Sequence, residues 1–328
     1  MTMQRRIFLA AGASAAASLA GPAFAQAGMP DTARFITGFP PGGTSDTICR
    51  RLAARMTGSY ARSVVVENRT GAGGQIAVQA VRSMPADGTN ILQTPMSMLG
   101  IYPHIYRKLA YDPFADFAPV SLGAQFDFGF AVGPAVPVSV TTVPQFLAWA
   151  RQDPARAAFG SPAAGSVPHF IGALLGKNAG MELRHASYRG SQPAVLDMMG
   201  GQLPAVSAPI GEFLPHLSTG KIRILGASGA ARSKFAPGVP TLVEQGFKDM
   251  AFSEWFGFFL PAAATPDTVS RLNAALRPAL ASADVVDGLA VMGLEAISST
   301  PGELAARLKS DHDRWGPIVK SIGFTAES

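Results

Sequence analysis

One pattern constrains the fold of this chain more than any other: a short strand, a glycine-rich loop and an amphipathic helix follow one another repeatedly. Residues 34–39 alternate as a strand does, the prolines and glycines at 40–43 break it, and a helix follows with Ile48, Leu52 and Met56 on one face. A β-branched strand at 63–67 leads into the glycine loop 71–74. The recurrence predicts an α/β chain with a largely parallel sheet.

The same alternation continues to the C-terminus. We expect further strands at 90–94, 126–132, 158–160, 222–227 and 256–260, and helices at 143–151, 169–179, 267–281, 284–292 and 301–321. A length of 328 residues predicts two domains. Hydrophobic residues make up 48% of the chain and charged residues 15%, which excludes intrinsic disorder.

The first 25 residues are predicted to be an export signal rather than part of the fold. Arg5 and Arg6 precede an apolar, alanine-rich run, and Ala23-Phe24-Ala25 forms a small-x-small cleavage site before Gln26. The paired arginines favour the twin-arginine route, although a Sec signal can also carry two arginines. Cleavage removes two arginines and no acid, so the formal charge falls from +5 to +3.

Charge and cysteine content exclude several classes of protein. The basic residues are scattered and form no run, so we expect no nucleic-acid partner. The uncharged segment 128–150 contains three prolines, which exclude a membrane helix there, so the mature protein is expected to be soluble and not membrane-embedded. The single cysteine, Cys49, excludes a disulfide framework and a cysteine-built zinc site, and its helical neighbours favour burial.

Catalytic and cofactor motifs are missing from the sequence. The five histidines form no H-x-x-x-H or H-x-H pair, and neither a G-x-S-x-G elbow nor a P-loop is present. The segment 71–76 lacks the last glycine of a dinucleotide-binding fingerprint. We therefore predict no catalytic residue, no metal and no cofactor.

Three glycine loops stand where a strand passes into a helix, at 42–43, 71–74 and 160–165. Such loops offer free backbone N–H groups and a positive helix terminus at the carboxyl ends of strands, where α/β sheets bind ligands. Each loop by itself is explained as an ordinary capped turn. Several on one chain, accompanied by hydroxyl residues, predict a cleft that binds a small carboxylate.

Ordered motifs give the chain a family resemblance. The segment FPPGGTSD at 39–46 resembles the F-P-P-G-G-x-x-D signature of the extracytoplasmic solute receptors of the tripartite tricarboxylate transporter, also called Bug proteins. ENRTGAGG at 67–74 is similar to their E-N-R-x-G-A-G-G, PADG at 85–88 to P-x-D-G, and WFG at 255–257 follows in family order. The resemblance covers nearly all of the chain that follows the signal.

The resemblance implies a type II periplasmic binding protein fold, with two lobes, each built on a central mostly parallel sheet flanked by helices, and a ligand cleft between them. It implies chain crossings near 125–130 and 256–260, so that lobe one comprises residues 26–126 and 258–328 and lobe two comprises 127–257. It also implies a non-enzymatic, monomeric periplasmic receptor for a small organic carboxylate. The expected partners are membrane subunits of a tripartite-type transporter, or alternatively a sensor kinase; an exported enzyme on the same scaffold is the alternative from another class.

The candidate ligand residues lie in the loops of both lobes. We expect Gly42 and Gly43 to bind the ligand, Asp46 to brace their loop, and Thr94 and Ser97 to line the cleft. For His169, contact with the ligand and support of a helix start are equally expected roles. For Arg189, a solvated side chain beside the cleft is favoured over contact with a carboxylate. The complete set is Phe39, Pro41, Gly42, Gly43, Asp46, Thr94, Ser97, Ser161, Gly165, Ser166, His169, Arg189 and Ala208.

The chain departs from the family pattern after Gly201-Gln202. Two acids of the usual pattern are absent, at about Pro204 and Ala208. If Ala208 faces the cleft, the pocket is less acidic and more apolar, which suits a bulkier or aromatic carboxylate.

Overall fold

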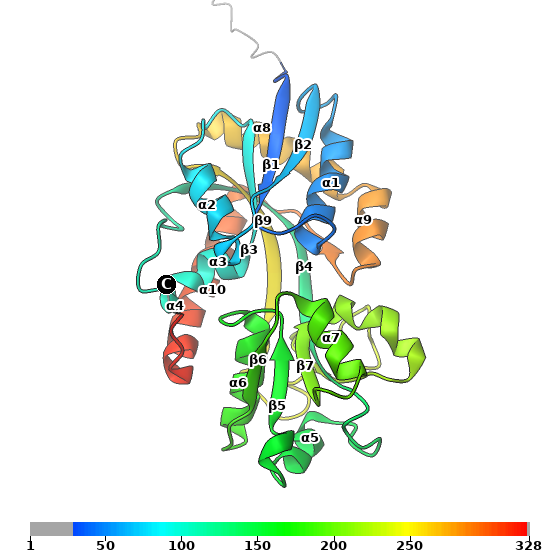
Figure 1. Ribbon diagram of the computed structural model, residues 1–328. Helices are drawn as coiled ribbons and strands as arrows, with labels where there is room; N and C mark the ends of the chain where they lie inside the picture. Colours follow the sequence, from blue (N-terminus) through cyan, green and yellow to red (C-terminus); the bar gives the residue numbers. More distant parts are fainter. Residues whose placement is uncertain (1–28, 327–328) are drawn as a thin grey trace, which may run out of the picture.

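The computed structural model describes residues 29–326, so the export signal predicted at residues 1–25 lies outside the described residues. Figure 1 shows two α/β bodies, one above the other, joined by long strands. The strands are β1 (Thr32–Thr37), β2 (Ser63–Asn68), β3 (Asn90–Pro95), β4 (Phe117–Val132), β5 (Ala158–Ser161), β6 (Arg184–Ser187), β7 (Ala205–Pro209), β8 (Arg223–Ala227), β9 (Ser253–Pro261) and β10 (Glu295–Ala296).

Helices alternate with these strands, as the sequence predicts. They are α1 (Thr44–Met56), α2 (Gln75–Arg82), α3 (Met96–Gly100), α4 (Tyr102–Ile105), α5 (Val143–Ala150), α6 (Val167–Asn178), α7 (Ser191–Met199), α8 (Pro266–Leu280), α9 (Ala283–Ala290) and α10 (Pro301–Ile322). Short 3-10 turns η1 (Ala72–Gly74), η2 (Pro154–Arg156), η3 (Ile210–Glu212) and η4 (Leu214–Thr219) complete the chain. The predicted α/β class is confirmed.

Strand β4 belongs to both bodies. Its residues Phe117 to Asp127 pair antiparallel with β9, and Phe128 to Val132 pair antiparallel with β7. The first lobe therefore has the order β2-β1-β3-β9-β4-β10, and the second has β6-β5-β7-β4-β8. Each lobe contains three parallel strands. These are β1, β2 and β3 in the first lobe and β5, β6 and β7 in the second.

The chain crosses between the lobes near the predicted positions. The outward crossing at Asp127–Phe128 lies inside the expected 125–130 segment. The return comes earlier than expected, because β9 already pairs with β4 at Ser253 and remains in the first sheet. The lobe boundaries predicted at 126/127 and 257/258 stay a proposal. The strand pairing favours boundaries at 127/128 and 252/253 instead.

Helix packing follows from the apolar faces read in the sequence. Helix α1 packs on α8 and α9, and Figure 1 shows α9 beside α1 and α8 passing behind β1 and β2. Cys49 on α1 is fully buried, and burial raises the pKa of its thiol well above the usual value. Helix α10 contacts α3 and α4 of the first lobe and α6 of the second.

Local signals fix the helix starts. Thr300 and Glu303 form a reciprocal capping box at the start of α10, and Thr142 and Gln145 form another at α5. The uncharged 128–150 segment forms the end of β4, a turn and α5. Within residues 29–326, no helix is both long enough and apolar enough to cross a bilayer.

Candidate functional site

The first part of the candidate site is the loop between β1 and α1, which holds Phe39, Pro41, Gly42 and Gly43. It packs tightly against the glycine loop that precedes α2: a Cβ on Gly38 would lie 2.6 Å from the Cα of Gly74. This close approach explains glycine at position 38, whereas Gly74 has a φ of +94° and a Cβ there would lie 2.8 Å from the Met98 side chain. Pro41 and Gly42 are exposed, whereas Phe39 is half-buried against the core.

Asp46 braces this loop from below. Its carboxylate, 2% exposed, accepts hydrogen bonds from the Gly42 N–H (2.9 Å), Arg50 Nε (2.7 Å) and Asn68 Nδ2 (2.9 Å). Burial alone would raise the pKa of Asp46, but these hydrogen bonds outweigh it and lower the pKa. This geometry supports bracing as the role of Asp46.

The first turn of α1 is open at the end of the loop. Gly43 is the N-cap in an extended conformation, and within the described residues no side chain caps this helix. The first N–H groups of a 13-residue helix therefore point out of the loop beside exposed Pro41 and Gly42. This arrangement suits an anion.

The second part of the candidate site is the junction of β3 and α3. Thr94 is buried, and its hydroxyl lies 3.1 Å from the sulfur of Met98, so the structure places it within the lobe rather than on an open face. Ser97 is the one residue of 91–100 that is half-exposed. Its backbone N–H donates to Oε1 of Glu254 on β9 at 2.9 Å.

The third part is the loop between β5 and α6 in the second lobe. Ser166 caps α6 by accepting from the His169 N–H at 3.5 Å, and its hydroxyl donates to the Ala163 carbonyl at 2.7 Å. The Gly165 N–H donates to Nδ1 of His169 at 3.0 Å. Of the two roles expected for His169, the structure favours support of the helix start.

A second histidine lies under this loop. The rings of His169 and His185 stack with centroids 4.0 Å apart. The pKa of each is lowered to about 4, by burial in His185 and by burial together with the neighbouring His185 in His169. Both rings are therefore neutral at pH 7, which leaves His169 Nδ1 free to accept from Gly165.

The pair Ser161 and His185 has the distance of a nucleophile and its base, 2.7 Å from Oγ to Nε2. Ser161 is fully buried, however, and its hydroxyl donates to the Ala163 carbonyl at 3.0 Å. The His185 nitrogen then donates rather than accepts, so the pair holds the loop and is not arranged to activate the hydroxyl. Within residues 29–326, no group of three or more His, Cys, Asp or Glu is placed to hold a metal ion.

The two lobes meet beside these loops. Gly165 is buried against the first lobe: a Cβ there would lie 2.7 Å from Cδ1 of Ile105 on α4 and 3.1 Å from the Phe324 ring. Its φ of +73° also favours glycine. The structure therefore brings the α3–α4 segment of one lobe next to the 161–166 loop of the other.

Two predicted site residues lie elsewhere. Ala208 is fully buried in a cluster with Val195, Met198 and Phe213, so its side chain faces the interior of the second lobe and not an open cleft. This placement removes the support for a pocket made apolar by Ala208. Arg189 is exposed on the loop after β6, as the solvated alternative expects.

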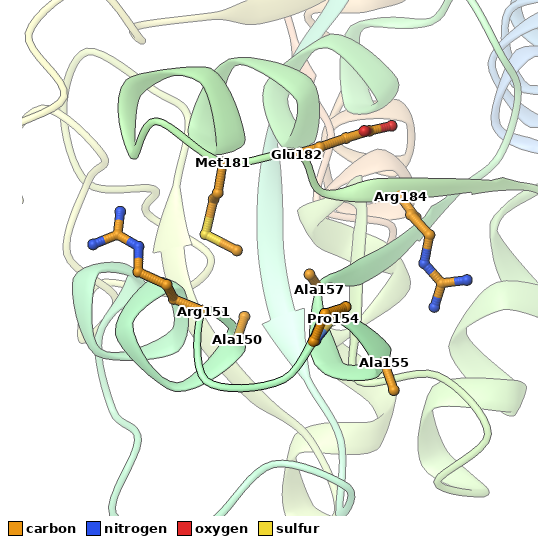
Figure 2. Close-up of a pocket in the computed structure, with 8 residues that line it drawn as sticks. All are labelled: Ala150, Arg151, Pro154, Ala155, Ala157, Met181, Glu182 and Arg184. Atoms are coloured by element: carbon orange, nitrogen blue, oxygen red, sulfur yellow. The ribbon is translucent and has the colours of Figure 1, made fainter.

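Three surface hollows of about 630, 690 and 720 Å³ lie away from these loops. A cavity of about 630 Å³ opens at the outer end of the second lobe, where Arg151 and Arg184 lie on opposite sides of Met181 (Figure 2). It lies at the start of β5, whereas the 161–166 loop follows the end of that strand. Its lining includes none of the candidate ligand residues.

Two residues that hold the site were missed from the sequence. His185 has no motif spacing, and only the pairing of β5 with β6 brings it to Ser161. Glu254 did have a signal, because it is the one charged residue in the otherwise apolar and polar run 252–261.

Comparisons with known proteins agree with this architecture. Residues 48–324 match the model of the family described as "Tripartite tricarboxylate transporter family receptor". The chain is 30% identical to Protein BugT of Bordetella pertussis over 94% of each chain. It is similar to the R. palustris protein Rpa4515 solved with adipate (28% identity, TM-score 0.81, 90% and 98% of the two chains). It is also similar to MatC from Rhodopseudomonas palustris with bound malate (26% identity, TM-score 0.77, 88% and 98%).

Proposed function

Because the chain belongs to the tripartite tricarboxylate transporter receptor family, we propose that it is a periplasmic solute receptor that captures a small organic carboxylate between its two lobes. The observation that carries this proposal is the likeness over nearly the whole fold to two proteins solved with adipate and with malate. The family consists of receptors rather than enzymes, and we assign no catalytic residue.

The geometry supports a carboxylate as the ligand. The uncapped N-terminus of α1 offers backbone N–H groups at the carboxyl end of β1, on the lobe that also carries Ser97. The loop before α6 stands at the carboxyl end of β5 in the other lobe and contacts the α3–α4 segment. A carboxylate between these loops is bound by backbone dipoles and hydroxyls with little help from charged side chains.

Capture proceeds by closure of the lobes. Strand β4 and the segment that leads into β9 join the lobes, so a small rotation about Asp127 and Ser253 brings the two loop sets together. A ligand that contacts both sets binds the closed form more tightly and increases its population.

We further propose that the receptor delivers its ligand to the membrane subunits of a tripartite-type transporter. This step is tested by uptake of labelled acid into proteoliposomes that hold those subunits, with and without the receptor. Uptake that does not depend on the receptor contradicts delivery and favours reporting to a sensor kinase. Light scattering tests the proposed monomer, and osmotic-shock fractionation tests the periplasmic location.

A thermal-shift screen with organic acids tests ligand capture directly. The panel contains adipate, malate, citrate, glutamate and benzoate, with glucose as a neutral control. An acid present at 100 times its Kd stabilises the folded state by about 2.7 kcal/mol and raises the Tm. Absence of a shift with every acid, together with turnover of ester substrates, contradicts the receptor and favours the exported enzyme.

A further inference from the structure

A buried acid lies where the chain returns from the second lobe to the first. Glu254 is the second residue of β9 and pairs with Phe126 of β4, two residues before β4 passes into the second sheet. It is 4% exposed. A carboxyl group is rarely buried to this extent without a cationic partner, so its position needs a reason.

The contacts of Glu254 point to the ligand side of the first lobe. Its Oε1 accepts the backbone N–H of Ser97 at 2.9 Å, across 157 positions of sequence. This bond ties the first turn of α3 to the crossover strand. Ser97 is also the one half-exposed residue within the otherwise buried segment 91–101, so the bond sets the position of a candidate ligand residue.

Within residues 29–326, no Lys, Arg or His forms an ion pair with this carboxyl. The carboxylate of the neighbouring Asp311 on α10 accepts hydrogen bonds from the Arg307 guanidinium at 2.9 Å and from the Trp255 indole N–H at 2.7 Å. A further titratable group near Glu254 is Tyr102 on α4, whose pKa is raised by burial, by Tyr106 and by Glu254. The pKa of Glu254 is raised to about 8, because burial, with a smaller contribution from Asp311, outweighs the hydrogen bonds from Ser97 and Met96 that lower it.

We propose that Glu254 is a positioning residue that holds Ser97 at the ligand site, and that a carboxylate ligand binds together with the protonated form of Glu254. The proposal rests on the proposed function, because it concerns the same site. A neutral Glu254 still accepts from Ser97 and does not repel an anion beside Ser97. An ionised Glu254 adds a second negative charge at low effective dielectric, so binding of an anion takes up a proton from solvent.

Titration calorimetry in two buffers of different ionisation enthalpy measures that proton directly. With adipate and malate as probes, we expect wild-type protein to take up a growing fraction of one proton between pH 7 and 8.5. The affinity should fall above pH 8, approaching a tenfold loss per pH unit. Wild-type protein that binds either acid with no proton uptake overturns the proposal, whatever any variant does.

Two variants separate position from charge. Glu254→Gln keeps an acceptor for the Ser97 N–H without ionising, so it should bind with no proton uptake and with affinity independent of pH in this range. Glu254→Ala removes the acceptor and should bind at least tenfold more weakly at every pH, with Gln restoring the affinity. The control is Glu182→Gln, an exposed acid of the outer cavity, which should behave as wild type.

The outcomes distinguish the two proposals. Binding by Glu254→Gln with the wild-type pH slope overturns the role of Glu254 and leaves the receptor function standing. Failure of every acid in the panel to bind wild-type protein overturns the receptor function, and this inference with it.

Discussion

At the scale of single residues, Asp46 shows how one carboxylate organises a ligand loop. It joins the loop, α1 and β2 through Gly42, Arg50 and Asn68. Because its pKa is lowered, the stability it contributes is present above its ordinary value of 3.8 and is lost as the pH falls through the lower folded pKa.

We predict that Asp46→Ala destabilises the protein by about 1–3 kcal/mol, because the Gly42 N–H, Arg50 and Asn68 lose the buried carboxylate that accepts their hydrogen bonds. Urea unfolding at pH 7 measures this change. Asp46→Asn retains one acceptor and should lose less. Equal stability of wild type and Asp46→Ala would show that the loop does not depend on this carboxylate.

The histidine pair predicts a pH dependence of stability. The pKa of His169 is lowered in the folded state to about 4, so below its unfolded value of about 6.5 the unfolded chain binds more protons. Stability from this residue therefore rises as the pH rises from about 4 to 6.5. Measured by thermal unfolding, the advantage of wild type over His169→Gln should grow across this range, and an advantage that stays constant with pH would contradict this prediction.

At the scale of elements, α10 is the helix that binds both lobes. Its Trp315 ring lies 5.1 Å from Phe252, and Phe324, just after the helix, lies 4.9 Å from His169. The Lys177 ammonium donates to the Ser321 carbonyl at 2.6 Å. Through these contacts the second lobe packs against the C-terminal end of α10, which begins in the first lobe.

We predict that Phe324→Ala costs about 1–2 kcal/mol of stability through lost ring packing and also loosens the lobes. Small-angle scattering should give a larger radius of gyration for the unliganded variant. The matched control is Val291→Ala, since Val291 is 78% exposed and should leave both quantities unchanged. An unchanged radius for Phe324→Ala would show that the lobes are held by other contacts.

Much of the element order could be predicted from the sequence, for physical reasons. Periodicity and glycine breaks gave α1, α8 and α10 within a residue or two at their starts. The run 205–209 was not predicted as a strand, because β7 is short and contains two alanines and a proline. The first half of β4 was missed because Pro119 and Gly123 hide its alternation, and only pairing with β9 makes it a strand.

The site was predicted less completely than the fold. Motif residues such as Gly42 and Ser166 could be named because their role is local. Ala208 could not be placed, since its face depends on strand register. The bond of Glu254 to Ser97 joins distant segments, and no local signal in the sequence predicts such a contact.

At the scale of the whole molecule, two glycines let the lobes touch near the crossover strands. A Cβ on Gly211, which follows β7, would lie 1.9 Å from the carbonyl oxygen of Met292, and Gly293 has a φ of +66°. The backbones of the two lobes are thus in direct contact at this point.

We predict that Gly211→Ala pushes the lobes apart, lowers stability by about 1–3 kcal/mol and weakens binding of the acid found in the screen. Chemical unfolding and calorimetry measure these effects. Gly302→Ala is the control, because a Cβ there meets nothing within 4 Å in helix α10. Its stability should stay equal or rise. Unchanged binding by Gly211→Ala would show that closure does not need this contact.

The sharing of β4 between two sheets has a consequence for the order of folding during synthesis. The first sheet needs β9, which leaves the ribosome more than a hundred residues after β4, whereas the second-lobe partners β5 to β8 emerge in between. Closing a long loop costs entropy before its contacts form. The nascent chain is therefore expected to assemble the inserted lobe first, before β9, the strand that pairs with β3, has been synthesised.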